Sequence, residues 1–196
     1  MAQNKLTHPC EAVVIGGSTG SIEVLLSLLP QLPVPLSFAL IIVVHRKNTA
    51  DSTLANLLAL RTTNPLGEVD DKDVIKPGTI YLAPADYHLL IEQNKVAALD
   101  DSEKVNYSRP SIDVTFESAA DVYGPALVGI LLSGANADGS KGMAAIKRTG
   151  GTLVVQQPET ALVGFMPQQA ILTNEVDYIL DVPGLATFLN SLNNIH

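Results

Sequence analysis

Residues 13 to 21 read VVIGGSTGS, a hydrophobic run followed by a glycine-rich turn that carries Ser18. The stretch from 16 to 20 fits the G-x-S-x-G spacing, in which small neighbours let a serine stand at a tight strand-to-helix turn. A serine hydroxyl becomes a nucleophile when an imidazole takes its proton and a carboxylate orients that imidazole. His45 and Asp138 are the candidates for these two roles, because each follows a hydrophobic run as Ser18 does.

The same glycine-rich turn could instead bind a phosphate, but two phosphate-binding motifs do not fit. A dinucleotide fingerprint requires an acidic residue at the end of the next strand, where this chain has His45. A P-loop requires Gly-Lys-Ser/Thr after the turn, and that sequence is absent. Ser18 and Asp138 also have a structural alternative, because serine and aspartate often cap the first turn of a helix.

Hydrophobic runs predict the strands that would position these side chains. Residues 12–17 and 38–45 are short β-branched runs without alternation, a pattern typical of strands that are covered on both faces of a parallel sheet. The segment between them has apolar residues at helical spacing and ends at Pro30 and Pro33, which completes a βαβ unit. Carboxyl ends of parallel strands meet at one edge of the sheet, so Ser18 and His45 are expected to lie close together.

The alternation of strands and helices returns after residue 110. The sequence there predicts a helix that Ser111 can cap, a buried strand, a helix closed by Gly150 and the strand TLVVQ. The stretch 66–100 has turn signals and short strand-like runs, which predict a β-rich excursion. We therefore predict an α/β fold, a doubly wound, mostly parallel sheet with helices on both faces. Residues 1–196 are expected to form a single catalytic domain.

Composition narrows the classes of function. The chain has 196 residues, of which 46% are hydrophobic, and this is enough for one continuous core. Its formal net charge of -8 argues against nucleic-acid binding and against anionic membranes. No secretory signal or membrane span is evident, so we expect a cytoplasmic protein without membrane insertion. The lone Cys10 excludes an internal disulfide, and no metal or organic cofactor is predicted.

Six separated segments resemble the catalytic domain of the chemotaxis protein-glutamate methylesterase family. They are IGGSTGS, VVHR, IKPGTIYLAP, YSRPSIDVTFESAA, LLSGANADGSKGM and GFMP, and the resemblance covers roughly residues 11 to 172. It implies serine-dependent hydrolysis of glutamate γ-methyl esters on receptor helices. By position it assigns nucleophile, base and acid to Ser18, His45 and Asp138.

The sequence departs from the family pattern in three places. The usual glycine after Ser-Thr-Gly is Ser21, and the glycine-methionine-glycine turn before the acid reads Gly134-Ala135-Asn136. The well-known members carry a receiver domain before the esterase, whereas here the first esterase strand begins by about residue 12. We therefore expect no intramolecular lid of that kind, and activity that small phosphodonors do not change.

Four further residues are candidates for the site. The backbone N–H groups of Thr19 and Ala135 could form an oxyanion hole, because free donors gather at a helix N-terminus. Arg109 could bind a substrate carboxylate or pair with Asp113. Met166 could line the pocket or pack beside a proline turn.

The sequence thus predicts a serine esterase that works through an acyl-serine on a methylated chemoreceptor-type protein, with a separate regulatory partner as an option. Two alternatives stay open at this point. One is the same fold acting as a glutamine deamidase or on another ester. The other is a non-enzymatic module that keeps the fold for partner binding or nucleotide capture.

Overall fold

A computed structural model of the protein describes residues 8–46 and 53–193, which form a seven-stranded sheet and a separate hairpin. The sheet has the order β3-β4-β2-β1-β7-β8-β9, and all neighbouring strands in it are parallel. The strands of the sheet are β1 (Ala12–Gly17), β2 (Ala39–Val44), β3 (Leu66–Glu68), β4 (Ile80–Leu82), β7 (Leu127–Leu131), β8 (Thr152–Gln156) and β9 (Tyr178–Leu180).

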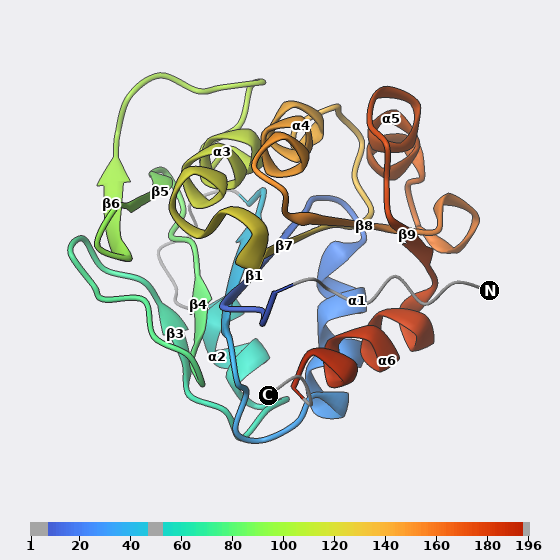
Figure 1. Cartoon of the computed structure of the whole chain (residues 1–196). Coiled ribbons are helices and arrows are strands. Elements are labelled where there is room, and N and C mark those ends of the chain that lie inside the picture. Colours follow the sequence, from blue (N-terminus) through green and yellow to red (C-terminus); the bar gives the residue numbers. More distant parts are fainter. Residues whose placement is uncertain (1–7, 47–52, 194–196) are drawn as a thin grey trace.

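Helices cover both faces of this sheet (Figure 1). One face packs against α1, α2 and α6, and the other against α3, α4 and α5. Alternate residues of β1 enter the two cores, because successive side chains of a strand point to opposite faces. The helices are α1 (Ser21–Leu28), α2 (Thr53–Ala59), α3 (Ile112–Tyr123), α4 (Ser140–Arg148), α5 (Phe165–Thr173) and α6 (Val182–Leu192), with short 3-10 turns η1 (Leu29–Gln31), η2 (Gly124–Ala126) and η3 (Pro158–Thr160).

The predicted doubly wound α/β fold is confirmed, and the stretch predicted to be β-rich proves to have two parts. The strands β3 and β4 extend the main sheet in parallel. Only β5 (His88–Glu92) and β6 (Val96–Asp100) leave it, as an antiparallel hairpin. This hairpin is attached to α3 by side chains of that helix, since the Ser118 hydroxyl accepts from the Ile91 amide at 3.0 Å and the Thr115 hydroxyl donates to the Leu89 carbonyl at 2.8 Å.

The topology brings three strand ends together. The chain passes from β1 to β2 on one side and later returns to β7 on the other side of β1, so β2, β1 and β7 are neighbours. In open α/β sheets the crevice at such a reversal is where ligands bind. The Ser18 amide donates to the Ser133 carbonyl beyond β7 at 2.9 Å, and the His45 amide donates to the Gly17 carbonyl at 3.2 Å. Ser18 and His45 therefore leave the sheet side by side.

Within the described ranges, none of the helices combines the length and the apolar character that crossing a membrane requires.

Candidate active site

Ser18 occupies a turn whose backbone is held at several points. Its carbonyl accepts from the Ser21 amide at 3.0 Å and from the Ser21 hydroxyl at 2.6 Å. Gly20 follows with φ 84, and a Cβ at that position would lie 2.6 Å from Leu162. Glycine is required there, because other residues rarely adopt this left-handed conformation.

The Ser18 hydroxyl makes no hydrogen bond to any residue that the structure describes. It does not cap α1, whose N-cap is Gly20 and lacks a side-chain hydrogen bond. The capping role that the sequence left open for this serine therefore has no support. What remains is a half-buried hydroxyl on a fixed turn, with its oxygen available for chemistry.

His45 and Asp138 form the central contact of the site. The Nε2 atom of His45 lies 2.7 Å from Oδ2 of Asp138, and the aspartate is fully buried. Burial alone would raise the pKa of Asp138, but hydrogen bonds from His45, from the Ile112 amide and from Asn106 outweigh it and lower that pKa. Asp138 is therefore ionised at neutral pH, and it can only accept from the imidazole.

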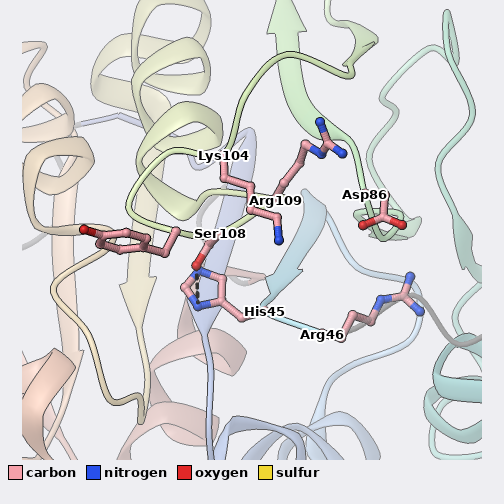
Figure 2. A pocket seen from close by; sticks show the side chains of 7 residues that line it. His45, Arg46, Asp86, Lys104, Ser108 and Arg109 are labelled. Carbon is pink, nitrogen blue, oxygen red and sulfur yellow. Dashed lines mark hydrogen bonds between the residues drawn. The ribbon is translucent and has the colours of Figure 1, made fainter.

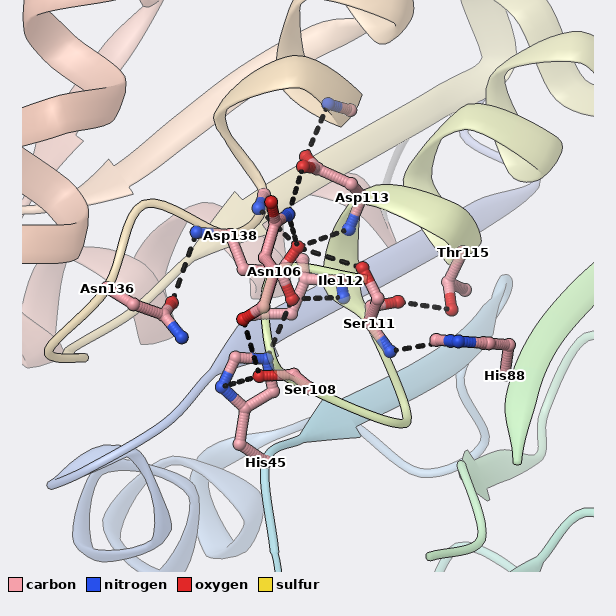
Figure 3. Close-up of polar contacts among 12 residues, drawn as sticks. His45, His88, Asn106, Ser108, Ser111, Ile112, Asp113, Thr115, Asn136 and Asp138 are labelled. Atoms are coloured by element: carbon pink, nitrogen blue, oxygen red, sulfur yellow. Dashed lines mark hydrogen bonds and ion pairs between the residues drawn. The ribbon is translucent and has the colours of Figure 1, made fainter. Parts of the chain in front are cut away.

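An ionised Asp138 fixes the tautomer of His45. Because the carboxylate must accept, Nε2 carries the proton and Nδ1 is the basic nitrogen. The Ser108 hydroxyl lies 3.3 Å from Nδ1 and can donate to it (Figure 3). The structure thus places Ser108, and not Ser18, on the basic nitrogen. Sequence reasoning missed Ser108, although it lies inside the YSRPS segment, because nothing in its spacing shows that this turn lies over His45.

Asp138 also holds the start of α3. The sequence left open that Asp138 caps the helix that follows it, but α4 has Gly139 as its N-cap. Asp138 instead accepts hydrogen bonds from the first amides of α3. The Ser111 hydroxyl, at the N-cap position of α3, donates to Asp138 and accepts from no amide of its own helix. Besides His45, the groups that donate to Asp138 are the Ile112 amide at 2.7 Å, the Ser111 hydroxyl at 2.9 Å, the Asn106 side chain at 3.0 Å, and the Asp113 and Gly139 amides at 3.1 Å.

A second buried carboxylate, Asp113, sits beside the first. Its Oδ1 accepts from the Gly142 amide in the first turn of α4 at 2.7 Å, so α3 and α4 each receive a carboxylate from the other segment. Burial raises the pKa of Asp113, and the nearby negative charge of Asp138 adds to the rise although the Gly142 amide lowers it. The pKa values of the two aspartates are therefore shifted in opposite directions. Of the two carboxylates, only Asp138 contacts the imidazole.

Asn106 connects the two carboxylates. Its side-chain nitrogen donates to Asp113 at 2.8 Å and to Asp138 at 3.0 Å (Figure 3). Its backbone has φ 52, a conformation that asparagine tolerates better than most residues. Through these bonds Asn106 fixes the turn that carries Ser108, which makes it a positioning residue that the sequence did not reveal.

We predict that Asn106→Ala lowers the free energy of unfolding by about 1–3 kcal/mol, because two buried carboxylates lose a donor. Asn106→Asp should cost more at pH 7, since a third carboxylate then faces two others. That extra cost should shrink as the pH falls, because the pKa of Asp113 is raised in the folded state and its protonation relieves the repulsion. Urea denaturation at pH 7 and pH 5 measures both effects. Equal stability of the two variants at pH 7 would show that the added carboxylate is not repelled, and equal stability of Asn106→Ala and the wild type would show that the amide donor is unimportant.

The remaining sequence-predicted residues divide into two groups. The N–H groups of Thr19 and Ala135 donate to no acceptor among the described residues, so both stay available as oxyanion donors. Arg109 does not pair with Asp113, and its Nη1 donates to the Asp101 and Ser102 carbonyls at 2.5 and 2.7 Å. Met166 is fully buried and packs beneath Gly134, where it supports the loop after β7.

Two observations concern metals and thiols. In the part of the chain that the structure covers, no group of three or more His, Cys, Asp or Glu side chains is arranged to hold a metal ion. Burial raises the pKa of the Cys10 thiol to about 12, so this cysteine is a protonated, inert group.

A serine-bearing glycine turn, an imidazole held by a buried carboxylate and a parallel α/β sheet together define a hydrolase-type site. Comparison with protein families matches residues 13–189 to the family described as CheB methylesterase. The chain belongs to the CheB methylesterase family, and the resemblance inferred from the sequence motifs is confirmed.

Individual relatives agree with this assignment. A putative protein-glutamate methylesterase/protein-glutamine glutaminase of Leptospira interrogans is 43% identical over 176 residues, which cover 90% of this chain and 91% of the relative. The protein-glutamate methylesterase/protein-glutamine glutaminase of Thermotoga maritima is 37% identical over 86% of this chain, but this chain matches only 50% of its length. The crystal structure of the Thermotoga maritima CheB methylesterase catalytic domain superposes with a TM-score of 0.89 at 33% identity, covering 93% of this chain and 98% of that one.

Proposed function

We propose that this protein is a protein-glutamate methylesterase that hydrolyses glutamate γ-methyl esters of a methylated chemoreceptor-type protein. The observation that carries the proposal is the 2.7 Å contact between His45 and the ionised Asp138, at the strand edge where the Ser18 turn also ends. The names of the relatives support the substrate class. The family match over residues 13–189 supports treating the chain as one catalytic domain.

The arrangement supports a two-stage hydrolysis through Ser18. In the first stage the Ser18 oxygen attacks the ester carbonyl carbon and its proton passes to Nδ1 of His45. The Thr19 and Ala135 amides stabilise the oxyanion, and the imidazole then protonates the leaving methoxide, which departs as methanol. In the second stage water attacks the acyl-serine with help from the same imidazole, and glutamate and free Ser18 are formed. Ser108 must leave Nδ1 for either stage, which a rotation of its side chain accomplishes.

The same machinery could attack an amide, with ammonia leaving in place of methanol. The names of the relatives include protein-glutamine glutaminase, and this favours deamidation as a second activity. The proposal also places the protein in the cytoplasm, which its single, buried cysteine fits, because disulfide-stabilised folds belong to oxidising compartments.

Methanol release tests the proposal. A helical receptor segment that carries methylated glutamate should be hydrolysed with a kcat/KM at least roughly 10²-fold above that of a small free methyl ester, because contacts remote from the ester contribute orientation. Equal values would contradict a protein substrate, although they would leave an esterase. Absence of methanol from both, together with no labelling by a fluorophosphonate probe, would favour the non-enzymatic alternative.

A further inference from the structure

A pocket of about 420 Å³ opens beside the basic nitrogen of the site. His45 and Ser108 form part of its wall, and three cationic residues, Arg46, Lys104 and Arg109, surround the same space (Figure 2). The pocket therefore adjoins His45, the proposed base of the reaction. A substrate side chain next to the ester would enter it.

The pocket has an excess of positive charge on a chain whose net charge is -8. Asp86 is the one acidic residue among the described side chains that line it. A cluster of cations on an acidic protein attracts an anionic group at this spot and repels it elsewhere, because opposite local charge guides and orients a charged ligand.

The three cations differ in how far they are already engaged. Arg46 pairs with Glu68 and donates to the Ala83 carbonyl at 3.2 Å. Arg109 donates to two loop carbonyls, as described above. The Nε–H groups of both arginines lack an acceptor among the described residues, so internal contacts meet the hydrogen-bonding capacity of both side chains only in part.

Lys104 is the cation that remains available. It is exposed, and within the described ranges it makes no hydrogen bond or ion pair. Figure 2 shows its side chain extending into the space between Arg109 and His45. An ammonium group in this position can bind a carboxylate without first breaking an internal contact.

We propose that this pocket is a subsite for an acidic side chain of the substrate protein, located one helical turn from the reacting ester, with Lys104 as its principal ligand. Side chains three or four residues apart on a helix are neighbours, about 5–6 Å between Cβ atoms, so such a carboxylate lies beside the ester and would meet the cations next to His45. The inference deepens the proposed function and rests on it. Substrate choice then depends on the residues around the methylated glutamate.

Methanol release from two matched helical substrates tests the subsite. One carries glutamate at the positions three and four residues from the methylated glutamate, and the other carries glutamine there. For Lys104→Gln we expect KM for the acidic substrate to rise roughly 3- to 10-fold, and the preference of the wild type for that substrate to disappear. Added salt should weaken the same preference, because it screens exposed charges.

Lys76→Gln is the matched control. Lys76 is an exposed lysine that precedes β4, at the amino ends of the parallel strands, whereas the pocket lies at their carboxyl ends. Its loss therefore changes the net charge equally without touching the pocket. The two variants separate a local contact from a general charge effect. If both raise KM equally, the subsite is overturned in favour of general charge steering.

Two further outcomes separate the subsite from the proposed function. Normal methanol release with an unchanged KM in Lys104→Gln overturns the subsite and leaves the esterase intact. If the wild type releases no methanol but binds the unmethylated acidic helix in fluorescence anisotropy, and Lys104→Gln weakens that binding, the esterase is overturned and the subsite stands. Inhibition by millimolar inorganic phosphate that is equal for the two substrates would overturn a substrate carboxylate as the occupant.

Discussion

Replacing Ser18 with alanine is expected to abolish methanol release while leaving the fold intact. Turnover should fall by roughly 10⁴- to 10⁶-fold, because the proposed acyl intermediate forms on the Ser18 oxygen. The melting temperature should hardly change, since the Ser18 hydroxyl bonds to no described residue and its backbone contacts persist in alanine. Methanol release and thermal unfolding on the same sample measure both quantities.

Ser108→Ala is the matched control for this experiment. It also removes one hydroxyl, and that hydroxyl is the one the structure places 3.3 Å from the basic nitrogen of His45. We expect Ser108→Ala to keep turnover within about tenfold of the wild type. Loss of activity in Ser108→Ala with retention in Ser18→Ala would reverse the assignment of the nucleophile. The double variant with His45→Ala should be little worse than Ser18→Ala alone, because residues that act as a unit are not additive.

The long central strands could be predicted from the sequence because their burial leaves a plain signature. All six residues of β1 and all six of β2 are buried, and a strand covered on both faces must be apolar throughout. The glycine turn and the strand ends then locate Ser18 and His45. These patterns are local in the sequence, so they can be recognised without a structure.

The short strands could not be placed in this way. The strands β3 and β4 have three residues each, too few for a periodic pattern, and their pairing in the main sheet depends on contacts with distant β2. The hairpin β5–β6 was visible as turn-rich sequence, but only the bonds from Ser118 and Thr115 show that it rests on α3.

The site shows the same division between local and distant information. The sequence places Asp138 before a helix, and capping of that helix is the local expectation. The actual partners of Asp138 are the amides at the start of α3, more than twenty residues earlier in the chain. The positions of Asn106 and Ser108 depend likewise on a turn with positive φ at Asn106 and Tyr107, which propensities do not predict.

Asp138→Asn is expected to lower turnover by roughly 10²- to 10⁴-fold, through the tautomer of His45. At Oδ1 the carboxylate accepts from four groups, and at Oδ2 from His45 and the Ile112 amide. The asparagine oxygen should therefore take the Oδ1 position, which places the amide nitrogen against His45. A donor there makes Nε2 the acceptor and puts the proton on Nδ1, which can then no longer take the Ser18 proton.

The same substitution should also destabilise the protein. The new amide nitrogen faces the Ile112 amide, and both are donors, so a buried N–H loses its partner. We expect the free energy of unfolding to fall by about 1–3 kcal/mol. Turnover must therefore be measured at a temperature where the variant is folded, and urea denaturation of the same sample gives the folded fraction.

Ser111→Ala separates the two effects. It removes one buried donor to Asp138 and should cost a similar amount of stability, but it keeps the carboxylate and hence the tautomer of His45. We expect Ser111→Ala to lose less than about tenfold in turnover per folded molecule. If Asp138→Asn and Ser111→Ala lose activity equally, in step with their stability, Asp138 acts only as the cap of α3. The acid would then have to be sought elsewhere, and Asp113 could serve only if the turn around Asn106 rearranged, because His45 now contacts Asp138 alone of the two carboxylates.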